Sequence, residues 1–248
     1  MSGHSKWHSI KHKKAAVDSK RGRIFTKIIR EMTVAARAGG GDADSNPRLR
    51  TAVLAAKGVN MPADNIKKAI QKGTGELAGQ ALEEITYEGY GPGGVAVLVD
   101  VMTDNRNRTT PEIRHAFGKC GGNMGESNSV AWMFETKGYI QVDKKGASED
   151  AVLEAALEAG ASDMTEEEES FDVSTPPNAL EAVRQTLEAK SFTILSAELG
   201  KFPQAYVKIA GKQAEQAMRL VDTLEDLDDV QNVWANFDVD DDAVGNSA

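Results

Sequence analysis

The sequence predicts a multidomain α+β protein in which a three-helix bundle precedes two α+β domains, one of them inserted in the other. Three patterns support this fold class. Helical periodicity alone runs through the first 75 or so residues, strands and helices alternate after them, and the last strand–helix–strand segment is too short to form a domain. A chain of 248 residues can bury the cores of two or three such domains.

Three short helices are predicted between residues 18 and 73, because apolar side chains recur there at helical spacing. Each begins at a capping or proline signal and ends at a glycine. The predicted spans are 18–39, 46–58 and 61–73. Since each helix has one apolar face, the three are expected to form a small bundle, which with the preceding arm makes up residues 1–78.

The second domain is predicted from two stretches of the chain, residues 79–135 and 204–240. The first stretch has strands at Ile85–Tyr87, Val95–Val101 and Val130–Phe134, and a helix at Thr110–Gly118 with Pro111 in its first turn. The second has a strand at Tyr206–Ile209, a helix at Lys212–Leu224 and a strand at Val230–Phe237. These last elements most simply complete the sheet that residues 85–134 begin.

The inserted domain is predicted at residues 136–203. Its strands are expected at Tyr139–Val142, at two places within Ser162–Ser174 around the acidic turn Glu166–Glu169, and at Ile194–Leu199. Its helices are expected at Glu149–Ala159 and Asn178–Ala189. The order β-α-β-β-α-β is that of the ferredoxin-like arrangement. Residues 241–248 form an acidic tail.

Charge is distributed unevenly along the chain. Residues 1–75 contain 16 Lys and Arg against 5 Asp and Glu, a net charge of +11, whereas residues 76–248 contain 13 against 33, a net charge of −20. Such asymmetry predicts a polyanionic partner for the basic part. The acidic remainder repels nucleic acid, which would orient the molecule with its basic end toward the partner.

The candidate nucleic-acid contacts lie close together near the N-terminus. They are Lys6, Trp7, Lys11, Lys13, Lys14, Lys20, Arg21, Arg23, Lys27 and Arg30. Cationic side chains neutralise phosphates and release counterions, which gives affinity without reading base sequence. Trp7 can stack on a base or anchor the arm to the bundle. The alternative is a solvated basic surface, and the local excess of charge favours contact, without distinguishing DNA from RNA.

A second candidate patch follows a strand of buried type and leads into a helix. Its cations are Arg106, Arg108 and Arg114, which accompany Asn105 and Asn107. Arginines beside a helix N-terminus can form an anion site. Helix capping and ion pairing with nearby acids explain the same residues equally well. As a functional patch, these arginines would make a second contact to a nucleic-acid backbone.

Membrane and secreted classes find no support in the sequence. No run of about 18 apolar residues is present, so no membrane span is expected. The N-terminus lacks the apolar stretch of a signal peptide. The single cysteine, Cys120, cannot form an internal disulfide. We therefore expect a cytoplasmic protein.

Enzymes also find little support. His115 is the only histidine outside the arm, so no Ser/His/Asp or Cys/His set is indicated, and a hydrolase that uses paired carboxylates is the least supported alternative. The glycines of residues 89–94 precede a strand, which excludes a phosphate-binding loop. His4, His8 and His12 lack a carboxylate or thiolate partner, so we expect neither a metal nor a cofactor.

Six motifs resemble those of the YebC/PmpR family. They are Gly3-His4-Ser5-Lys6-Trp7, Ile10-Lys11-His12-Lys13-Lys14, Asp18-Ser19-Lys20-Arg21-Gly22, Gly89-Tyr90-Gly91-Pro92-Gly93-Gly94, Thr103-Asp104-Asn105-Arg106-Asn107-Arg108-Thr109, and Gly121-Gly122-Asn123 running on to Val130-Ala131-Trp132-Met133-Phe134. The resemblance runs the length of the chain and implies the same three-domain arrangement. It also implies a cytoplasmic DNA-binding transcriptional regulator, although related proteins, including mitochondrial ones, are translational activators that associate with ribosomes.

We therefore expect a non-enzymatic transcriptional regulator that binds double-stranded DNA through its basic arm and bundle. The alternative is a ribosome-associated translation factor that binds RNA through the same surface. Phosphate-directed charge is alike for both partners, so the sequence leaves this choice open, together with the oligomeric state.

Overall fold

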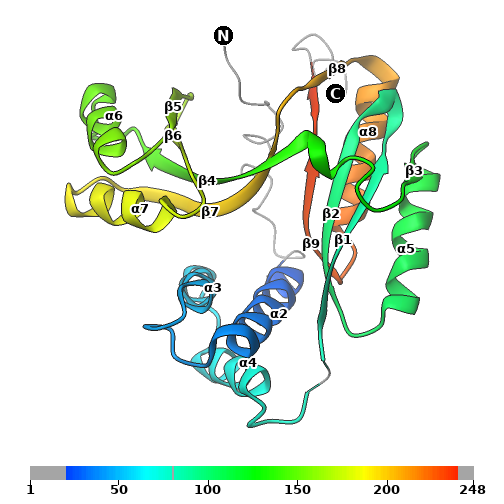
Figure 1. Cartoon of the computed structure of the whole chain (residues 1–248), viewed down its shortest axis with the longest axis horizontal. Coiled ribbons are helices and arrows are strands. Elements are labelled where there is room, and N and C mark those ends of the chain that lie inside the picture. The colour runs from blue at the N-terminus through cyan, green and yellow to red at the C-terminus, as the bar shows by residue number, and fades with distance from the viewer. Residues whose placement is uncertain (1–20, 80, 240–248) are drawn as a thin grey trace. The chain divides into compact units, whose positions relative to one another are not determined.

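The structure is a computed structural model that describes residues 21–79 and 81–239. The described chain divides into two compact units, Trp132–Tyr206 and the residues on both sides of it. The predicted fold class is confirmed, because a helical bundle precedes two α+β domains and the ferredoxin-like one is inserted in the other (Figure 1). Over the described ranges, no helix has both the length and the apolar character that crossing a membrane requires.

The bundle consists of α2 (Arg21–Gly39), α3 (Pro47–Gly58) and α4 (Ala63–Thr74). Asn46 joins the first two of these helices. Its side-chain oxygen accepts a hydrogen bond from the Leu49 amide at 3.1 Å, which caps α3. Its side-chain nitrogen donates to two carbonyl groups at the end of α2, at 2.8 and 2.9 Å. One buried amide therefore fixes the turn between the helices.

The bundle core is built from small and flexible apolar side chains. Its buried members are Met32, Ala35, Ala36, Leu49, Ala52, Ala56, Met61 and Ala69. Helices α2 and α4 pack closely at Gly73. A Cβ atom there would lie 2.4 Å from the carbonyl oxygen of Thr33 and 2.6 Å from the Cβ atom of Ala36. Glycine is therefore required at this crossing.

The second domain is built on a four-stranded antiparallel sheet with the order β3-β1-β2-β9. Its strands are β1 (Glu83–Tyr90), β2 (Ala96–Thr103), β3 (Asn123–Met124) and β9 (Val230–Ala235). A 3-10 turn, η2 (Pro92–Gly94), joins β1 to β2. Helices α5 (Arg106–Lys119) and α8 (Gly211–Glu225) cover one face of the sheet and share its apolar core (Figure 1).

The inserted domain contains six elements in the predicted β-α-β-β-α-β order. They are β4 (Phe134–Asp143), α6 (Glu149–Glu158), β5 (Asp163–Glu166), β6 (Ser170–Thr175), α7 (Leu180–Ala189) and β7 (Ile194–Pro203). The antiparallel sheet order β5-β6-β4-β7 is that of a ferredoxin-like domain. Its core is separate from the other two, and includes Ile140 and Val173 from the sheet and Val152 and Leu187 from the helices.

Two of the predicted elements are wrong in detail. The helix predicted at Thr110–Gly118 begins at Arg106, because the side chain of Asn105 caps it by accepting from the Arg108 amide at 3.2 Å. Pro111 therefore lies inside the helix and not in its first turn.

The strand predicted at Val130–Phe134 is a 3-10 turn, η3 (Ala131–Met133), that leads into β4. The side chain of Glu88 accepts from the amides of Val130 and Ala131 at 2.8 and 2.7 Å, so these amides make no strand ladder.

The last strands also differ from expectation. Only β9 completes the main sheet, whereas β8 (Val207–Ile209) pairs in parallel with β10 (Phe237–Val239) as a separate two-stranded sheet. The predicted strand Val230–Phe237 is divided at Asn236. This residue's side-chain oxygen accepts from the Ala96 amide at 2.7 Å, and its carbonyl accepts from the amide that begins β8 at 2.7 Å. Asn236 therefore marks the point at which the chain changes sheet.

Candidate nucleic-acid interface

The structure describes the side chains of only some predicted contact residues. These are Arg23, Lys27, Arg30, Arg106, Arg108 and Arg114. The arm residues Lys6, Trp7, Lys11, Lys13, Lys14 and Lys20 lie outside the described residues, as do His4, His8, His12 and the tail 241–248. Arg21 begins α2, but its side chain is not described either. The roles assigned to these residues stay predictions.

Three predicted contacts lie on one face of α2, because Arg23, Lys27 and Arg30 are spaced four and three residues apart. This basic face contacts the segment Glu225–Asp229, which ends α8 and leads into β9, and which we call the acidic segment. Four of its five residues are acidic. The helix dipole at the C-terminal end of α8 further favours cations there.

Each cation of the basic face has a partner in the acidic segment. Arg23 forms an ion pair with Asp226, Lys27 Nζ donates to the carbonyl oxygen of Glu225 at 3.2 Å, and Arg30 donates to the carbonyl oxygen of Asp228. The Arg23 and Asp226 side chains are 40% and 63% exposed, so water weakens that pair. The face that the sequence predicts for phosphate is therefore occupied by the chain itself.

Asp229 is the centre of this contact and also reaches the second predicted patch. Its side chain is only 3% exposed. One carboxylate oxygen lies 2.8 Å from Arg30 NH2. The other accepts from Arg108 at 2.6 Å, from Thr109 Oγ1 at 2.5 Å and from Thr103 Oγ1 at 3.0 Å. A single buried carboxylate thus joins α2 of the bundle to the start of α5.

The hydrogen bonds keep Asp229 ionised. Burial by itself raises the pKa of this carboxyl, but hydrogen bonds from Thr109, Arg108 and Thr103 and the charge of Arg30 outweigh burial, so the pKa lies below its ordinary value. The hydrogen bond to Asp229 is the main cause of the raised pKa of Arg108. The cluster is therefore a charged structural contact across the neutral pH range.

The residues of the second patch differ in their contacts within the chain. Arg108 is held by Asp229 and, at 3.2 Å, by Asp104, and Asn105 caps the helix. Arg106 and Arg114 are exposed and have no ion pair with any described residue. Capping and ion pairing thus account for Asn105 and Arg108, whereas Arg106 and Arg114 stay available to a partner.

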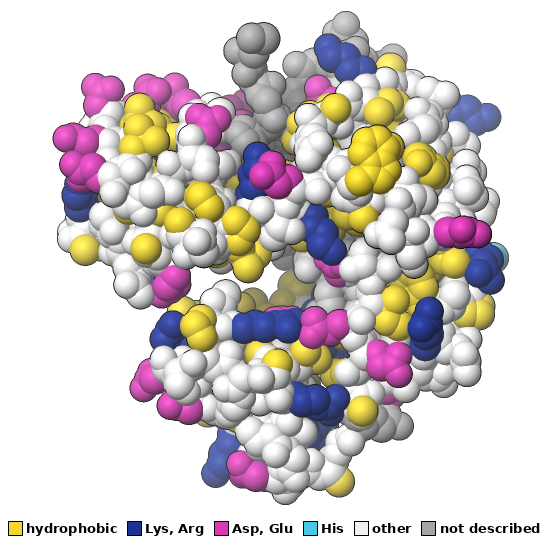
Figure 2. Space-filling model, viewed as in Figure 1, with side chains coloured by type: hydrophobic (Ala, Val, Ile, Leu, Met, Phe, Trp, Pro, Cys, Tyr) yellow, Lys and Arg dark blue, Asp and Glu magenta, His cyan; other side chains and the backbone are white. Residues whose placement is uncertain are grey.

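The arginines of the bundle are all engaged where their side chains are described. Arg48 contacts Glu31 at 2.6 Å and Glu84 at 3.0 Å, and its hydrogen bond to Glu31 is the main cause of its raised pKa. Arg37 and Arg50 donate to backbone carbonyl groups, at 3.4 and 3.1 Å. Figure 2 shows the resulting mixture of basic and acidic side chains on the visible face of the bundle.

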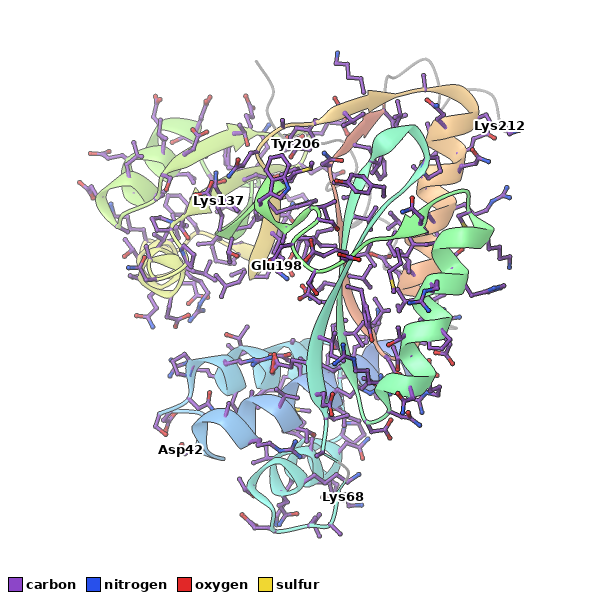
Figure 3. All side chains as sticks on the ribbon, turned by 45° about the vertical axis from the view of Figure 1, so that its right-hand side comes forward. Asp42, Lys68, Lys137, Glu198, Tyr206 and Lys212 are labelled. Atoms are coloured by element: carbon purple, nitrogen blue, oxygen red, sulfur yellow. The ribbon has the colours of Figure 1, made fainter. Side chains whose placement is uncertain are left out.

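The lysines of α4 differ from these arginines. Lys67, Lys68 and Lys72 are exposed and form no ion pair with described residues, and Lys67 and Lys68 lie on the side of α4 away from its buried Ala69 and Gly73. Lys68 points away from the helix ribbon in Figure 3. These residues were not predicted individually as contacts. The sequence signal that could have identified them is the placement of these lysines beside small residues, since small residues indicate the buried face of a helix.

The remaining candidate chemical groups that the sequence suggests have structural settings in the described residues. Within them, no group of three or more His, Cys, Asp or Glu side chains could hold a metal ion. Cys120 is buried, with its sulfur 3.8 Å from Thr223 Oγ1. The glycines of residues 89–94 form the turn η2, where Gly93 and Gly94 have φ angles of 74° and 78°. This turn joins two antiparallel strands and is not a phosphate-binding loop.

Two family models match nearly the whole chain. Residues 5–76 match the model described as the TACO1/YebC protein N-terminal domain. Residues 82–237 match the model described as the TACO1/YebC second and third domain. The boundary between the two matches follows the change from the bundle to the first α+β domain.

Relatives and a solved structure agree with these matches. Proteins named "Probable transcriptional regulatory protein" from Trichlorobacter lovleyi and Desulfatibacillum aliphaticivorans are 61% and 56% identical, over 96% and 99% of both chains. The crystal structure of a conserved hypothetical protein from Aquifex aeolicus has a TM-score of 0.87 and 50% identity, and the match covers 96% of this chain and 98% of that one. The chain therefore belongs to the TACO1/YebC family.

Proposed function

We propose that this chain is a non-enzymatic, cytoplasmic transcriptional regulator that binds double-stranded DNA through the arm, residues 6–20, and the exposed lysines of α4. The observation that carries the proposal is the contrast within the bundle. Its described arginines are engaged within the chain, whereas Lys67, Lys68 and Lys72 are exposed without an ion pair to any described residue. The names of the relatives support a role in transcription.

The chemistry of these lysines determines the kind of contact. A lysine ammonium is a compact charge on a flexible stem and lacks the planar fork with which arginine recognises a guanine edge. We therefore expect α4 to bind phosphates and to position the duplex without reading its sequence. Asp64, in the first turn, is the one acidic residue of α4, so the helix keeps a net positive charge.

A translation factor that binds ribosomal RNA is the second candidate. The same observation favours it, since ammonium groups contact the phosphates of A-form RNA as readily as those of DNA. The two candidates differ in specificity. A regulator should discriminate a defined promoter from bulk DNA by about 4 kcal/mol or more. A translation factor should bind DNA weakly and without such discrimination.

The test is crosslinking in cells followed by sequencing of both the DNA and the RNA that the protein retains. A transcriptional regulator should enrich promoter DNA, and the enrichment should fall in the triple variant Lys67→Gln, Lys68→Gln, Lys72→Gln. The matched control is Lys145→Gln, Lys208→Gln, Lys212→Gln, which removes the same charge from exposed lysines outside the bundle. Retention of ribosomal RNA without promoter DNA would contradict the proposal and support the translation factor.

A further inference from the structure

We infer that the acidic segment, Glu225–Asp229, substitutes for phosphate on the basic face of α2 and so lowers the affinity of the intact chain for nucleic acid. The inference rests on the proposed function and adds its regulation. Arg23, Lys27 and Arg30 would be a phosphate-binding face of the bundle that becomes available when the acidic segment is displaced.

The chemistry of the contact supports the inference that the acidic segment substitutes for phosphate. Carboxylate and phosphate oxygens accept charge-assisted hydrogen bonds from the same guanidinium and ammonium donors. Each described cation of the basic face contacts the acidic segment, through the carboxylates of Asp226 and Asp229 and the carbonyl groups of Glu225 and Asp228. A nucleic-acid backbone would therefore compete with the acidic segment for these donors.

The solvent exposure of the contact decreases from its outer end to its inner end. At the outer end, the Arg23 and Asp226 side chains are 40% and 63% exposed, so the pair is weak and can exchange its partner. At the inner end, Asp229 is 3% exposed and is also held by Thr103 and Thr109, so its contacts persist. Displacement would thus begin at Arg23 and proceed to Lys27, while the buried end keeps the bundle attached.

The outer ion pair, Arg23–Asp226, has no evident structural need. An exposed pair of this kind adds little to stability. It nevertheless neutralises the first cation of the basic face. The lysines of α4 have no such partner among the described residues, so the acidic segment covers one basic face of the bundle and not the other.

The first test is the affinity of Asp226→Asn for a fluorescent DNA duplex and for an RNA hairpin. The substitution removes the outer carboxylate from an exposed position, so the fold should persist. We expect binding to tighten by roughly threefold to tenfold, and the slope of log K against log salt to steepen by up to about 0.9 for each cation released. Glu154→Gln on α6 is the control, because it removes one exposed acidic charge without an ion pair to described residues.

The second test combines Asp226→Asn with Arg23→Gln. In the parent chain, Arg23→Gln should weaken binding less than twofold, because the acidic segment already occupies Arg23. In the Asp226→Asn background, the same change should remove the gain in affinity. The cycle therefore measures whether nucleic acid and Asp226 use the same arginine.

The outcomes separate the inference from the proposed function. Equal affinities for Asp226→Asn and Glu154→Gln, with binding otherwise intact, would overturn the inference alone. Equal losses from Arg23→Gln in both backgrounds would overturn it too, since Arg23 would then be a contact that the acidic segment does not block. Absence of binding by the parent chain and by Asp226→Asn alike would contradict the proposed function, and the inference with it.

Discussion

Asp229 connects residues that are distant in sequence. It accepts hydrogen bonds or an ion pair from Arg30 in α2, from Arg108 and Thr109 in α5, and from Thr103 at the end of β2. The sequence identifies Arg30 and Arg108 as two separate basic patches, and the structure shows that they share one carboxylate. Such a pairing cannot be predicted from local patterns, because neither arginine has this acid within its own helix.

Replacing Asp229 with alanine should destabilise the fold. The change removes one acceptor from the Thr103 and Thr109 hydroxyl groups and leaves Arg30 and Arg108 without their buried carboxylate, so we expect a loss of about 3 kcal/mol in the free energy of unfolding. Urea unfolding at pH 7 measures this loss. Asp226→Ala is the control, and should cost less than about 1 kcal/mol because its pair with Arg23 is exposed. A similar small loss for both variants would show that Asp229 is not the structural centre.

The contribution of Asp229 should also depend on pH. Its pKa is lower in the folded chain than the value of about 3.9 expected in the unfolded chain. The carboxylate therefore stabilises the fold above the unfolded pKa, and this stabilisation is lost as pH falls through the folded pKa. The stability difference between the parent chain and Asp229→Ala should be constant from pH 7 to 5 and shrink below about pH 4. Shrinkage already between pH 7 and 5 would contradict this assignment.

At the scale of elements, Gly73 is a close packing point between α2 and α4. Gly73→Ala should destabilise by about 1–3 kcal/mol through the clash with the Thr33 carbonyl, despite alanine's higher helix propensity. Gly58→Ala is a matched control in α3, because nothing lies within 4 Å of its added Cβ atom. It should be neutral or stabilising by up to about 1 kcal/mol. Thermal unfolding of both variants measures this difference in stability. Equal effects would show that close packing at Gly73 does not limit the side chain there.

Glu88 shows how one side chain can replace regular pairing in an element. Its two oxygens accept from the amides of Asn128, Val130 and Ala131, at 2.6, 2.8 and 2.7 Å. Glu88→Gln replaces one acceptor with a donor that faces these amides, so the loop should detach and limited proteolysis should cut it within residues 125–131. Glu112→Gln, an exposed change on α5, should leave the cleavage rate unchanged. Equal resistance of both variants would contradict the role of Glu88.

The elements that the sequence predicts best have local signals. Asn46-Pro47 predicts the start of α3 because capping and first-turn proline act within a few residues. The apolar residues Val130–Phe134 predict a strand, yet Glu88, from a distant strand, accepts from the Val130 and Ala131 amides. The division of the last strand at Asn236 likewise depends on a bond to Ala96. Local sequence patterns therefore cannot predict hydrogen bonds between a side chain and a backbone group that is distant in sequence.

At the scale of the whole molecule, the charge asymmetry predicts a basic contact region near the N-terminus but not which of its cations are paired within the chain. Ion pairs within the chain engage Arg23, Arg30 and Arg48. Their acidic partners lie in α2, in β1 and in the acidic segment, so a count of charges cannot separate paired from exposed cations. The fold class could be predicted because β9 follows the insertion with a strand pattern that needs the earlier sheet.

The most direct test of the account is the salt dependence of duplex binding by the intact chain. The parent protein is compared with the α4 variant Lys67→Gln, Lys68→Gln, Lys72→Gln and with the control Lys145→Gln, Lys208→Gln, Lys212→Gln. The account predicts that the α4 variant binds more weakly and that its slope of log K against log salt is shallower by about 2–3, while the control resembles the parent. An unchanged slope in the α4 variant, or equal losses in both variants, would contradict the claim that the bundle contacts nucleic acid through α4.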